Sequence, residues 1–351
     1  MNHMRRKTRQ VRAGNVTIGS GAPVTVQSML NVIASDAEGN VRQAVALEKA
    51  GCEIVRMSVP DQDAVRSFAK VREHISIPLV ADIHFDYRMA LESVAAGADK
   101  IRINPGNIGD ESRVKKVVDA CRAAGVPIRI GVNSGSVEKE ILAKYGGPTP
   151  QALVDSALHH AALLEKYDFY DTVISIKSSS VPDMVQAYRL AAEQCDYPLH
   201  LGVTEAGTAH MGLIKSAAGI GSLLMDGIGD TIRVSLTADP VQEVYAGHDI
   251  LNAIGLRTDR PQLVSCPTCG RTKVDLIAIA GEVEKRLAGC HKPIKVAVMG
   301  CVVNGPGEAK EADIGIAGGD GCGLIFKKGE VLRKVPEDRI VDELMAEIEK
   351  M

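Results

Sequence analysis

AGADKIRINPGN, residues Ala96–Asn107, contains in full the unit that decides the fold of this chain. A glycine that closes an alanine-rich segment is typical of a helix end, because glycine adopts the left-handed backbone conformation found there. The aliphatic run Lys100–Ile103 predicts a short buried strand, and the polar turn Asn104–Asn107 follows it. The stretch therefore predicts a helix end, a strand and a loop in succession.

The same unit recurs along most of the chain. Alanine-glycine pairs also end at Gly51 and Gly125, each shortly before another aliphatic run. A hairpin over Val11–Ser28 leads into eight expected strands, which are Val24–Gln27, Glu53–Met57, Leu79–Ala81, Lys100–Ile103, Ile128–Gly131, Thr172–Ile176, Leu199–Val203 and Thr231–Ser235. Eight βα units in about 250 residues predict an α/β protein with a TIM (β/α)8 barrel, and a doubly wound open sheet is the alternative.

A second, smaller domain is expected after the barrel. The periodicity changes beyond Arg257, and Arg260-Pro261 resembles a linker, so we predict a barrel over 1–258 and a small α+β domain over 259–351. The elements expected there are a helix over Lys273–Leu287, strands at Ile294–Met299, Ile314–Ala317 and Leu324–Phe326, and a closing helix from Glu337.

Composition narrows the class of protein. The chain has 351 residues, no tryptophan and a net charge of −3, which argues against general nucleic-acid binding. Its eight cysteines are scattered, with no apolar signal segment and no long apolar span. This pattern predicts a reduced, cytoplasmic protein without a membrane segment rather than a disulfide framework.

The second domain carries three cysteines suited to one soft metal. Cys266 and Cys269 form a CxxC pair, and Cys301 follows on a glycine-rich turn. An iron-sulfur cluster fits if a labile ligand such as Glu308 completes the set. A structural zinc site, for which His291 is an available fourth ligand, and a redox-active dithiol remain alternatives.

Five expected strands carry a basic residue near their C-terminal ends. These residues are Arg56, Arg102, Arg129, Lys177 and Arg233. In a barrel these ends converge on the active-site face. Desolvating a group of like charges is costly unless an anion neutralises it, and arginine binds phosphate in a bidentate manner. The cluster therefore predicts a substrate rich in phosphate.

The same strand ends supply polar groups for chemistry. They are Asp82, His84, Asn104, Asn133, Thr204, Glu205 and Ser235. Glu205 is the strongest candidate for a proton donor or acceptor, because a carboxylate beside a cationic mouth is suited to acid-base work. His84 is the second candidate, since its place at a strand end favours a functional role.

Six motifs together closely resemble the 4-hydroxy-3-methylbut-2-enyl diphosphate synthase family of the non-mevalonate isoprenoid pathway. They are Val26–Met29, Ile103–Asn107, Thr231–Thr237, Cys266–Thr272, Gly300–Glu308 and Ile316–Gly319. The resemblance runs from about Arg9 to the C-terminus. It implies a [4Fe-4S] cluster held by Cys266, Cys269, Cys301 and Glu308, in a two-domain enzyme with a TIM barrel.

The resemblance also implies an activity. The family opens the ring of 2-C-methyl-D-erythritol 2,4-cyclodiphosphate and removes a hydroxyl, using two electrons that the cluster delivers singly, to give 4-hydroxy-3-methylbut-2-enyl diphosphate. The barrel mouth would bind the diphosphate through its basic residues and polar neighbours, and Glu205, His84 and Glu308 would be catalytic. A ferredoxin or flavodoxin donor is implied, as is a homodimer in which one subunit's cluster domain caps the other's barrel.

One segment departs from the family pattern. Leu30–Ala34 reads LNVIA where the family usually has a threonine-rich run, so hydroxyl contacts from that loop are not expected here. Two other classes of function remain open on the residues alone. One is a barrel enzyme acting on a phosphorylated or pterin-like substrate with structural zinc, and the other is an iron-sulfur electron carrier or scaffold.

Overall fold

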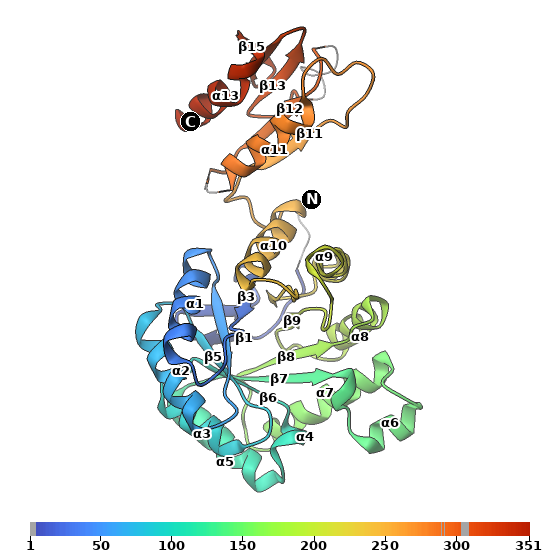
Figure 1. The fold of residues 1–351 in the computed structure, drawn as a ribbon. Helices are drawn as coiled ribbons and strands as arrows, with labels where there is room; N and C mark the ends of the chain where they lie inside the picture. The colour runs from blue at the N-terminus through green and yellow to red at the C-terminus, as the bar shows by residue number, and fades with distance from the viewer. Residues whose placement is uncertain (1–4, 289, 291, 303–308) are drawn as a thin grey trace. The chain divides into compact units, whose positions relative to one another are not determined.

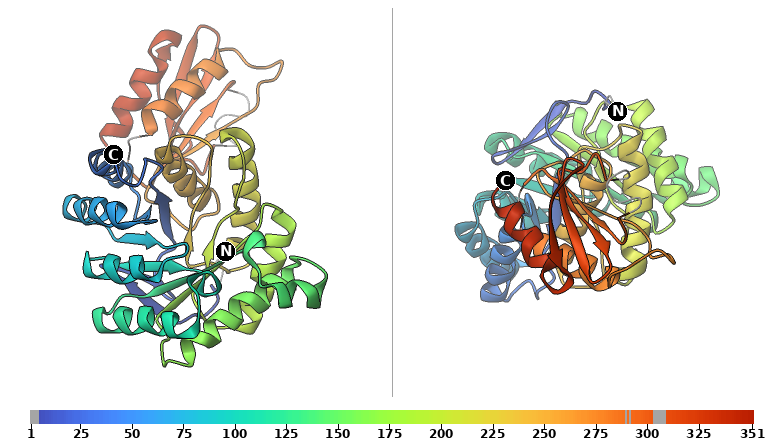
Figure 2. Two further views of the ribbon diagram at one scale, coloured as in Figure 1. Left: turned by 60° about the horizontal axis from the view of Figure 1, so that its bottom comes forward. Right: turned by 90° about the horizontal axis from the view of Figure 1, so that it is seen from above.

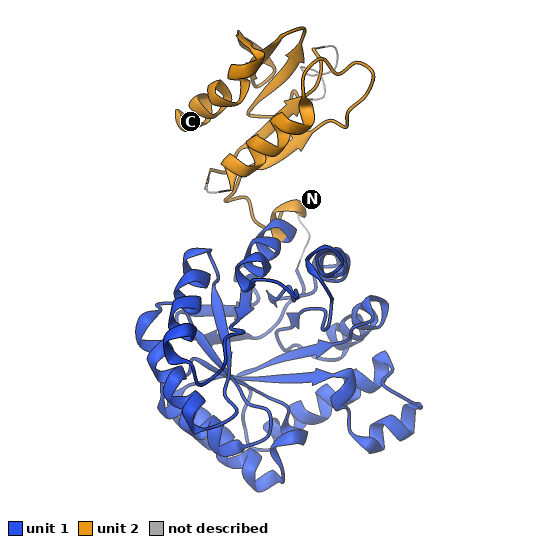
Figure 3. Cartoon of the chain, in the orientation of Figure 1, with its two compact units in different colours: residues 1–250 blue, residues 251–351 orange. Residues whose placement is uncertain are grey.

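The computed structural model describes residues 5–288, 290, 292–302 and 309–351 (Figure 1). Contacts divide the chain into two compact units, Met1–Ile250 and Leu251–Met351 (Figure 3). The expected boundary at 258/259 falls between helix α10 (Pro240–Ala253) and strand β11 (Gln262–Ser265). Each unit is described separately below.

The first unit is a closed parallel barrel. Its strands are β3 (Thr25–Met29), β4 (Ile54–Ser58), β5 (Leu79–Asp82), β6 (Lys100–Ile103), β7 (Ile128–Asn133), β8 (Thr172–Lys177), β9 (His200–Leu201) and β10 (Thr231–Ile232). They pair in the order β8-β7-β6-β5-β4-β3-β10-β9. A parallel bridge between Ile174 and Leu199 joins the two ends. The predicted TIM barrel is confirmed, and the open-sheet alternative is excluded because the ring closes.

Every expected barrel strand is present, although β9 and β10 are shorter than predicted. The N-terminal hairpin consists of β1 (Gln10–Ala13) and β2 (Val16–Gly19), so it ends well before Ser28. That difference arises because Val24 onward turns into the barrel and pairs with β4 and β10 instead.

Helices cover the outside of the barrel strands (Figures 1 and 2). They are α1 (Ala37–Lys49), α2 (Gln62–His74), α3 (Tyr87–Ala95), α4 (Pro105–Ile108), α5 (Glu111–Ala124), α6 (Lys139–Tyr145), α7 (Pro150–Glu165), α8 (Val181–Gln194), α9 (Ala209–Met225) and α10. A short 3-10 turn, η1 (Ser134–Ser136), follows β7. Within the described residues, no helix combines the length and apolarity needed to cross a membrane.

The interior of the barrel is unusually polar. Successive side chains of each strand point alternately outward, toward the helices, and inward. The outward side chains are mostly aliphatic, whereas several inward ones are polar. By this register Gln27, Val80, Arg129 and His200 form one interior layer, contributed by alternate strands. Such layers usually consist of branched aliphatic residues. This layer is therefore polar, like the C-terminal ends of the strands, although it lies inside the barrel.

The second unit is a small α+β fold. Its sheet has the order β11-β12-β13-β14-β15. The remaining strands are β12 (Lys295–Met299), β13 (Ile314–Gly319), β14 (Cys322–Lys327) and β15 (Glu330–Pro336), and the helices are α11 (Leu276–Leu287) and α13 (Ile340–Glu349). A 3-10 turn, η2 (Glu337–Arg339), precedes α13. The expected elements are all present, and sequence reasoning missed only the two edge strands β11 and β15 of those described.

Apolar clusters hold this unit together on both faces of its sheet. One contains Val283 of α11, Leu344 of α13 and Ile316 of β13. The other contains Phe326 and Met299. A Cβ on Gly315 would lie 2.5 Å from Phe326 Cζ, so the ring fills the space left by that glycine.

Replacing Phe326 should destabilise the second unit strongly. The side chain is 0% exposed, so Phe326→Ala should lower the free energy of unfolding by about 3–5 kcal/mol. Val331, which pairs opposite Phe326 but is 52% exposed, provides the control, and Val331→Ala should change stability by no more than about 0.5 kcal/mol. Urea denaturation followed by circular dichroism distinguishes the two. Equal losses would contradict this assignment of the core.

Candidate functional site

A cavity of about 180 Å³ lies at the C-terminal ends of the barrel strands. Its lining residues are Met29, Arg56, Asp82, His84, Arg102, Arg129, Asn133, Ser175, Lys177, Thr204, Arg233 and Ser235. The five basic residues that sequence reasoning grouped are therefore brought together, with five of the polar partners. Met29 and Ser175 were not anticipated, although Ser175 stands two residues before Lys177 and so points to the same side of β8.

Asp82 is the carboxylate at the centre of this cavity. Arg102 Nη1 lies 3.1 Å from Asp82 Oδ1, while Arg56 Nε and His84 Nε2 each lie 3.6 Å from Oδ2. Burial alone would raise the pKa of Asp82, but Arg56 and Arg102 outweigh it and lower the pKa to about 2. Asp82 therefore stays ionised and holds two arginines in place.

A second buried carboxylate fixes Arg233. Glu243 of α10 accepts hydrogen bonds from Arg233 Nε and Nη2, each at 3.1 Å. Its oxygens also accept from Ser28 Oγ at 2.9 Å and from the Leu236 amide at 3.1 Å. This carboxylate thus joins β3, β10 and the loop after β10. Sequence reasoning missed Glu243, because this residue lies on a helix and belongs to no strand-end motif.

The other two basic residues of the cavity, Arg129 and Lys177, have no carboxylate partner among the described residues. Arg129 is 1% exposed and Lys177 is 7% exposed, and no ion pair is found for either within the described residues. Burial, followed by repulsion from Arg56 and Arg233, lowers the pKa of Lys177 well below its ordinary value. Burial also lowers the pKa of Arg56 to about 10. An anion that enters the cavity would relieve this repulsion.

Two glycines make room for the basic side chains. A Cβ on Gly131 would lie 2.3 Å from Arg102 Nε, and one on Gly202 would lie 3.1 Å from Lys177 Nζ. Both glycines occupy inward positions of their strands, between layers of long side chains. Their absence of a side chain lets the two cations cross the barrel interior.

Two other predicted strand-end residues, Glu205 and Asn104, lie outside the cavity lining. Glu205 follows Thr204 but is exposed, and its backbone adopts a positive φ of 51°. Asn104 caps α4, accepting from the Gly106 amide at 3.1 Å and donating to Ser136 O at 3.3 Å. In the atypical Leu30–Ala34 segment, Leu30 is buried and Ile33 is 76% exposed, so no hydroxyl from this loop reaches the cavity.

The three cysteines of the proposed metal site lie in the second unit. Strands β11 and β12 are parallel neighbours. Cys266 directly follows β11, and Cys301 stands two residues after the end of β12. The Gly300 amide donates to Cys266 Sγ at 3.3 Å, which links the two turns. The backbone amide and side chain of Arg271 lower the pKa of the Cys269 thiol. Glu308 and His291 lie outside the described residues.

These observations fit a thiolate-bound group. Cysteines that follow adjacent parallel strands share one edge of the sheet, and an amide hydrogen bond to sulfur is a common feature around iron-sulfur clusters. Lowering the pKa of Cys269 favours the thiolate, which is the ligating form.

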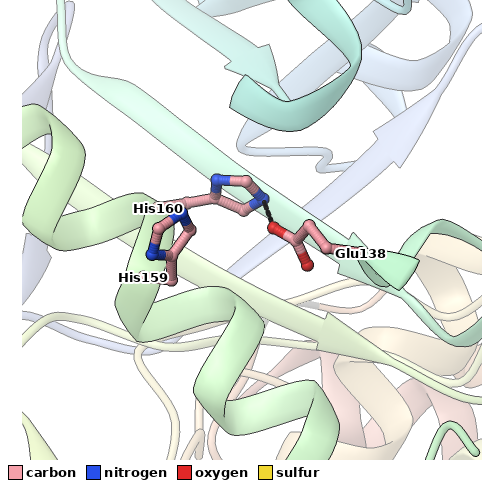
Figure 4. Close-up of side chains that lie close together, drawn as sticks. All are labelled: Glu138, His159 and His160. Carbon is pink, nitrogen blue, oxygen red and sulfur yellow. Dashed lines mark ion pairs between the residues drawn. The ribbon is translucent and has the colours of Figure 1, made fainter. Parts of the chain in front are cut away.

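A different cluster was not anticipated from the sequence. Glu138, His159 and His160 offer ligand atoms that all lie within 4.8 Å of one another (Figure 4). His160 Nε2 lies 2.5 Å from Glu138 Oε1, and Ser156 Oγ donates to Glu138 Oε2 at 2.6 Å. Burial opposes ionisation, yet hydrogen bonds from His160 and Ser156 lower the pKa of Glu138 to about 2. Since His159 is exposed, we interpret Glu138 and His160 as an ion pair that ties α7 to the start of α6.

Comparison with known proteins assigns both units to one family. The GcpE TIM-barrel domain matches residues 8–248, and the GcpE protein C-terminal domain matches residues 262–350. The chain belongs to the GcpE family. This confirms the resemblance stated from the motifs, which named the same enzymes by their activity.

GcpE relatives match over the whole chain. The 4-hydroxy-3-methylbut-2-en-1-yl diphosphate synthase (flavodoxin) of Caldanaerobacter subterraneus subsp. tengcongensis is 60% identical over 351 residues, covering 100% of this chain and 99% of the relative. The protein of the same description from Geobacter sulfurreducens is 57% identical over 348 residues, covering 99% of each chain. The similarity to these relatives therefore extends over both units of the chain.

Solved structures similar to this GcpE chain share its barrel. A dihydropteroate synthase from Xanthomonas albilineans has a TM-score of 0.50 at 16% identity, covering 70% of this chain and 96% of that one. A 3-dehydroquinate dehydratase from Geobacillus kaustophilus has a TM-score of 0.51 at 14% identity, covering 72% and 98%. At such identities the likeness shows the fold alone, and it does not support the pterin-like alternative.

The close approach at Gly131 can be tested by adding a methyl group. Gly131→Ala should displace Arg102 from Asp82 and weaken the binding of inorganic diphosphate by about tenfold or more, because a charge-assisted contact is lost. Gly135→Ala, in the loop after the same strand, is the control, since nothing lies within 4 Å of a Cβ there. Calorimetric titration measures both. Unchanged affinity in Gly131→Ala would show that Arg102 does not contribute to anion binding.

Proposed function

We propose that this chain catalyses the reductive dehydroxylation and ring opening of 2-C-methyl-D-erythritol 2,4-cyclodiphosphate to 4-hydroxy-3-methylbut-2-enyl diphosphate. The observation that carries the proposal is the cavity lined by five basic residues in a GcpE barrel, because a cyclic diphosphate supplies the negative charge that this site lacks. The chain is accordingly an oxidoreductase, in keeping with relatives that are described as synthases of that product.

The basic residues would bind and activate the diphosphate. Arg56, Arg102 and Arg129 present guanidinium groups, which can each form two parallel hydrogen bonds to phosphate oxygens. Lys177 of β8 and Arg233, which directly follows β10, line the same cavity. When the ring C–O bond breaks, negative charge develops on the leaving phosphate oxygen, and fixed cations stabilise that charge without reorganising. Asn133, Thr204 and Ser235 would orient the ligand through amide and hydroxyl contacts.

We further propose that Cys266, Cys269, Cys301 and Glu308 hold a [4Fe-4S] cluster. When bound, the cluster would supply electrons one at a time and a Lewis-acidic iron. The environment of Cys269, which favours the thiolate, and the hydrogen bond from the Gly300 amide to Cys266 Sγ support this set of ligands. The same hydrogen bond would also hold the turns that carry Cys266 and Cys301 at a fixed separation.

The electron donor, assembly and compartment follow from the same proposal. Relatives are described as flavodoxin-dependent, so flavodoxin is the proposed donor, with ferredoxin as the other small carrier of single electrons. The basic cavity and the cysteines belong to separate units of the chain. A homodimer in which the cysteines of one subunit serve the barrel of the other would unite them. Eight unpaired cysteines suit a reducing cytoplasm.

Cluster loading and turnover can be tested together. Anaerobically prepared wild type should contain iron and sulfide, absorb visible light as iron-sulfur proteins do, and convert the cyclic diphosphate when given a strong artificial reductant. Cys301→Ser should lose the absorption and at least about 100-fold of the activity, because loss of a mere hydrogen-bond partner of a metal ligand already costs about 10–100-fold. Cys195→Ser, a cysteine at the end of α8, is the control and should retain both. A wild type that binds zinc alone would refute the cluster.

Glu205 is the proposed proton donor to the departing hydroxyl, and His84 is the second candidate. The left-handed backbone conformation of Glu205 is uncommon for a residue other than glycine, and such conformations concentrate at functional sites. Glu205→Gln should lower kcat by about 100-fold or more with little change in KM, because the amide cannot donate an acidic proton. Glu193→Gln, on the exposed part of α8, is the control. Near-normal kcat in Glu205→Gln would remove this residue from the mechanism.

A further inference from the structure

Lys100 is a buried lysine for which the proposed chemistry has no use. It begins β6, is 0% exposed and does not line the cavity. Its ammonium nitrogen has no hydrogen-bond partner among the described residues. A charged amine in such a place would lack both hydration and a counterion, which is among the most costly arrangements in a protein.

The strand register places Lys100 directly below the cationic cavity. It shares an interior layer with Ile54, Val173 and Thr231, none of which is charged. The layer above contains Gln27, Val80, Arg129 and His200. Arg129 lines the cavity, so a single layer separates Lys100 from the space that a ligand would occupy.

Polar atoms in these two layers are left without partners. They are both side-chain heteroatoms of Gln27, Lys100 Nζ, Arg129 Nε and Nη1, and His200 Nε2. His200 Nδ1 lies 3.4 Å from Thr231 Oγ1, so its ring is oriented while its other nitrogen remains open. Buried polar groups are normally paired, so this concentration of unpartnered atoms makes the protonation state of the interior a point that needs explanation.

The charges that act on Lys100 are mostly of its own sign. Burial, followed by Arg129 and Arg56, lowers the pKa of Lys100 well below its ordinary value. Asp99 opposes this, but its Oδ2 already accepts from the Leu79 amide at 2.8 Å and lies 3.4 Å from Arg72 Nε. Burial, followed by repulsion from Arg129, likewise lowers the pKa of His200, in the layer above, well below its ordinary value.

We propose that Lys100 is an uncharged amine in the ligand-free protein and takes up a proton when a diphosphate binds in the cavity above it. A bound polyanion neutralises Arg129 and Arg56 electrostatically. It thereby removes the repulsion that adds to burial in lowering the pKa of Lys100. Lys100 therefore adjusts the net charge of the site and does not itself touch the reacting atoms. The inference rests on the proposed function only in taking a diphosphate as the ligand.

Proton uptake can be measured directly. Inorganic diphosphate is titrated into the full-length protein by calorimetry, near neutral pH, in two non-phosphate buffers of small and large ionisation enthalpy. The dependence of the heat on the buffer gives the number of protons taken up. Lys100→Met, which keeps most of the length of the side chain but removes the amine, should take up fewer protons than wild type, by as much as one per site. Protonation changes of the ligand itself cancel in this difference.

The pH dependence of affinity provides the second readout. Each unit of rising pH should weaken diphosphate binding to wild type more than to Lys100→Met, by up to about tenfold. Lys115→Met, which removes an exposed lysine on α5, is the control and should behave as wild type. A merely structural role for Lys100 would shift both affinity curves without changing their slopes.

Stability verifies that the variant is folded. Because the pKa of Lys100 in the folded state is lowered, the unfolded state binds the extra proton, and wild-type stability should increase as pH rises toward 10.5. Lys100→Met should be at least as stable as wild type at neutral pH, and Lys100→Gln provides a second neutral variant. Equal proton uptake by wild type and both variants would overturn the inference alone. Absence of diphosphate binding by wild type would overturn the proposed anion site as well.

Discussion

The structure depends on one electrostatic constraint, which is the burial of several cations around Asp82 inside a closed barrel. Five basic side chains line the cavity, whereas Asp82 and Glu243 are the carboxylates paired with them in the described part of the chain. Desolvation makes this excess of positive charge unfavourable in the absence of a ligand. The glycines at 131 and 202 and the ion pairs of Asp82 and Glu243 are all devices that keep these side chains in place despite their repulsion.

This constraint connects the fold to the chemistry. A TIM barrel normally fills its interior with branched aliphatic side chains, which contribute most to its stability. Here several inward positions carry lysine, arginine, histidine and glutamine, and only a few, such as Ile54, Val80 and Val173, are aliphatic. Free energy that a conventional core would contribute is given up for a cluster of cations, which we propose as an anion-binding site. The outer contacts between strands and helices must then supply most of the stability of this unit.

Much of this organisation could be predicted from the sequence because it follows local rules. Each barrel strand was visible as a short aliphatic run, and the basic residues recur at the same point of successive runs. The edge strand β15 was missed because most of its residues are exposed and three of them are charged, and β11 was missed because it follows a proline that suggested a linker. Glu243 and the Glu138–His160 pair could not be predicted, since tertiary packing alone brings them to their partners. Lys100 did carry a signal, because it precedes Arg102 by two residues and so faces the same side of β6.

The most direct test of the central claim is the effect of inorganic diphosphate on the thermal stability of the barrel unit, with sulfate at equal ionic strength as the control. Uncompensated cations predict a rise in Tm with diphosphate, equivalent to about 2.7 kcal/mol at a concentration of 100 Kd. Arg129→Met should unfold at a higher temperature than wild type without ligand and should show a smaller rise with diphosphate, because a buried, unpaired charge has been removed. A wild-type Tm that does not respond to diphosphate would contradict the account.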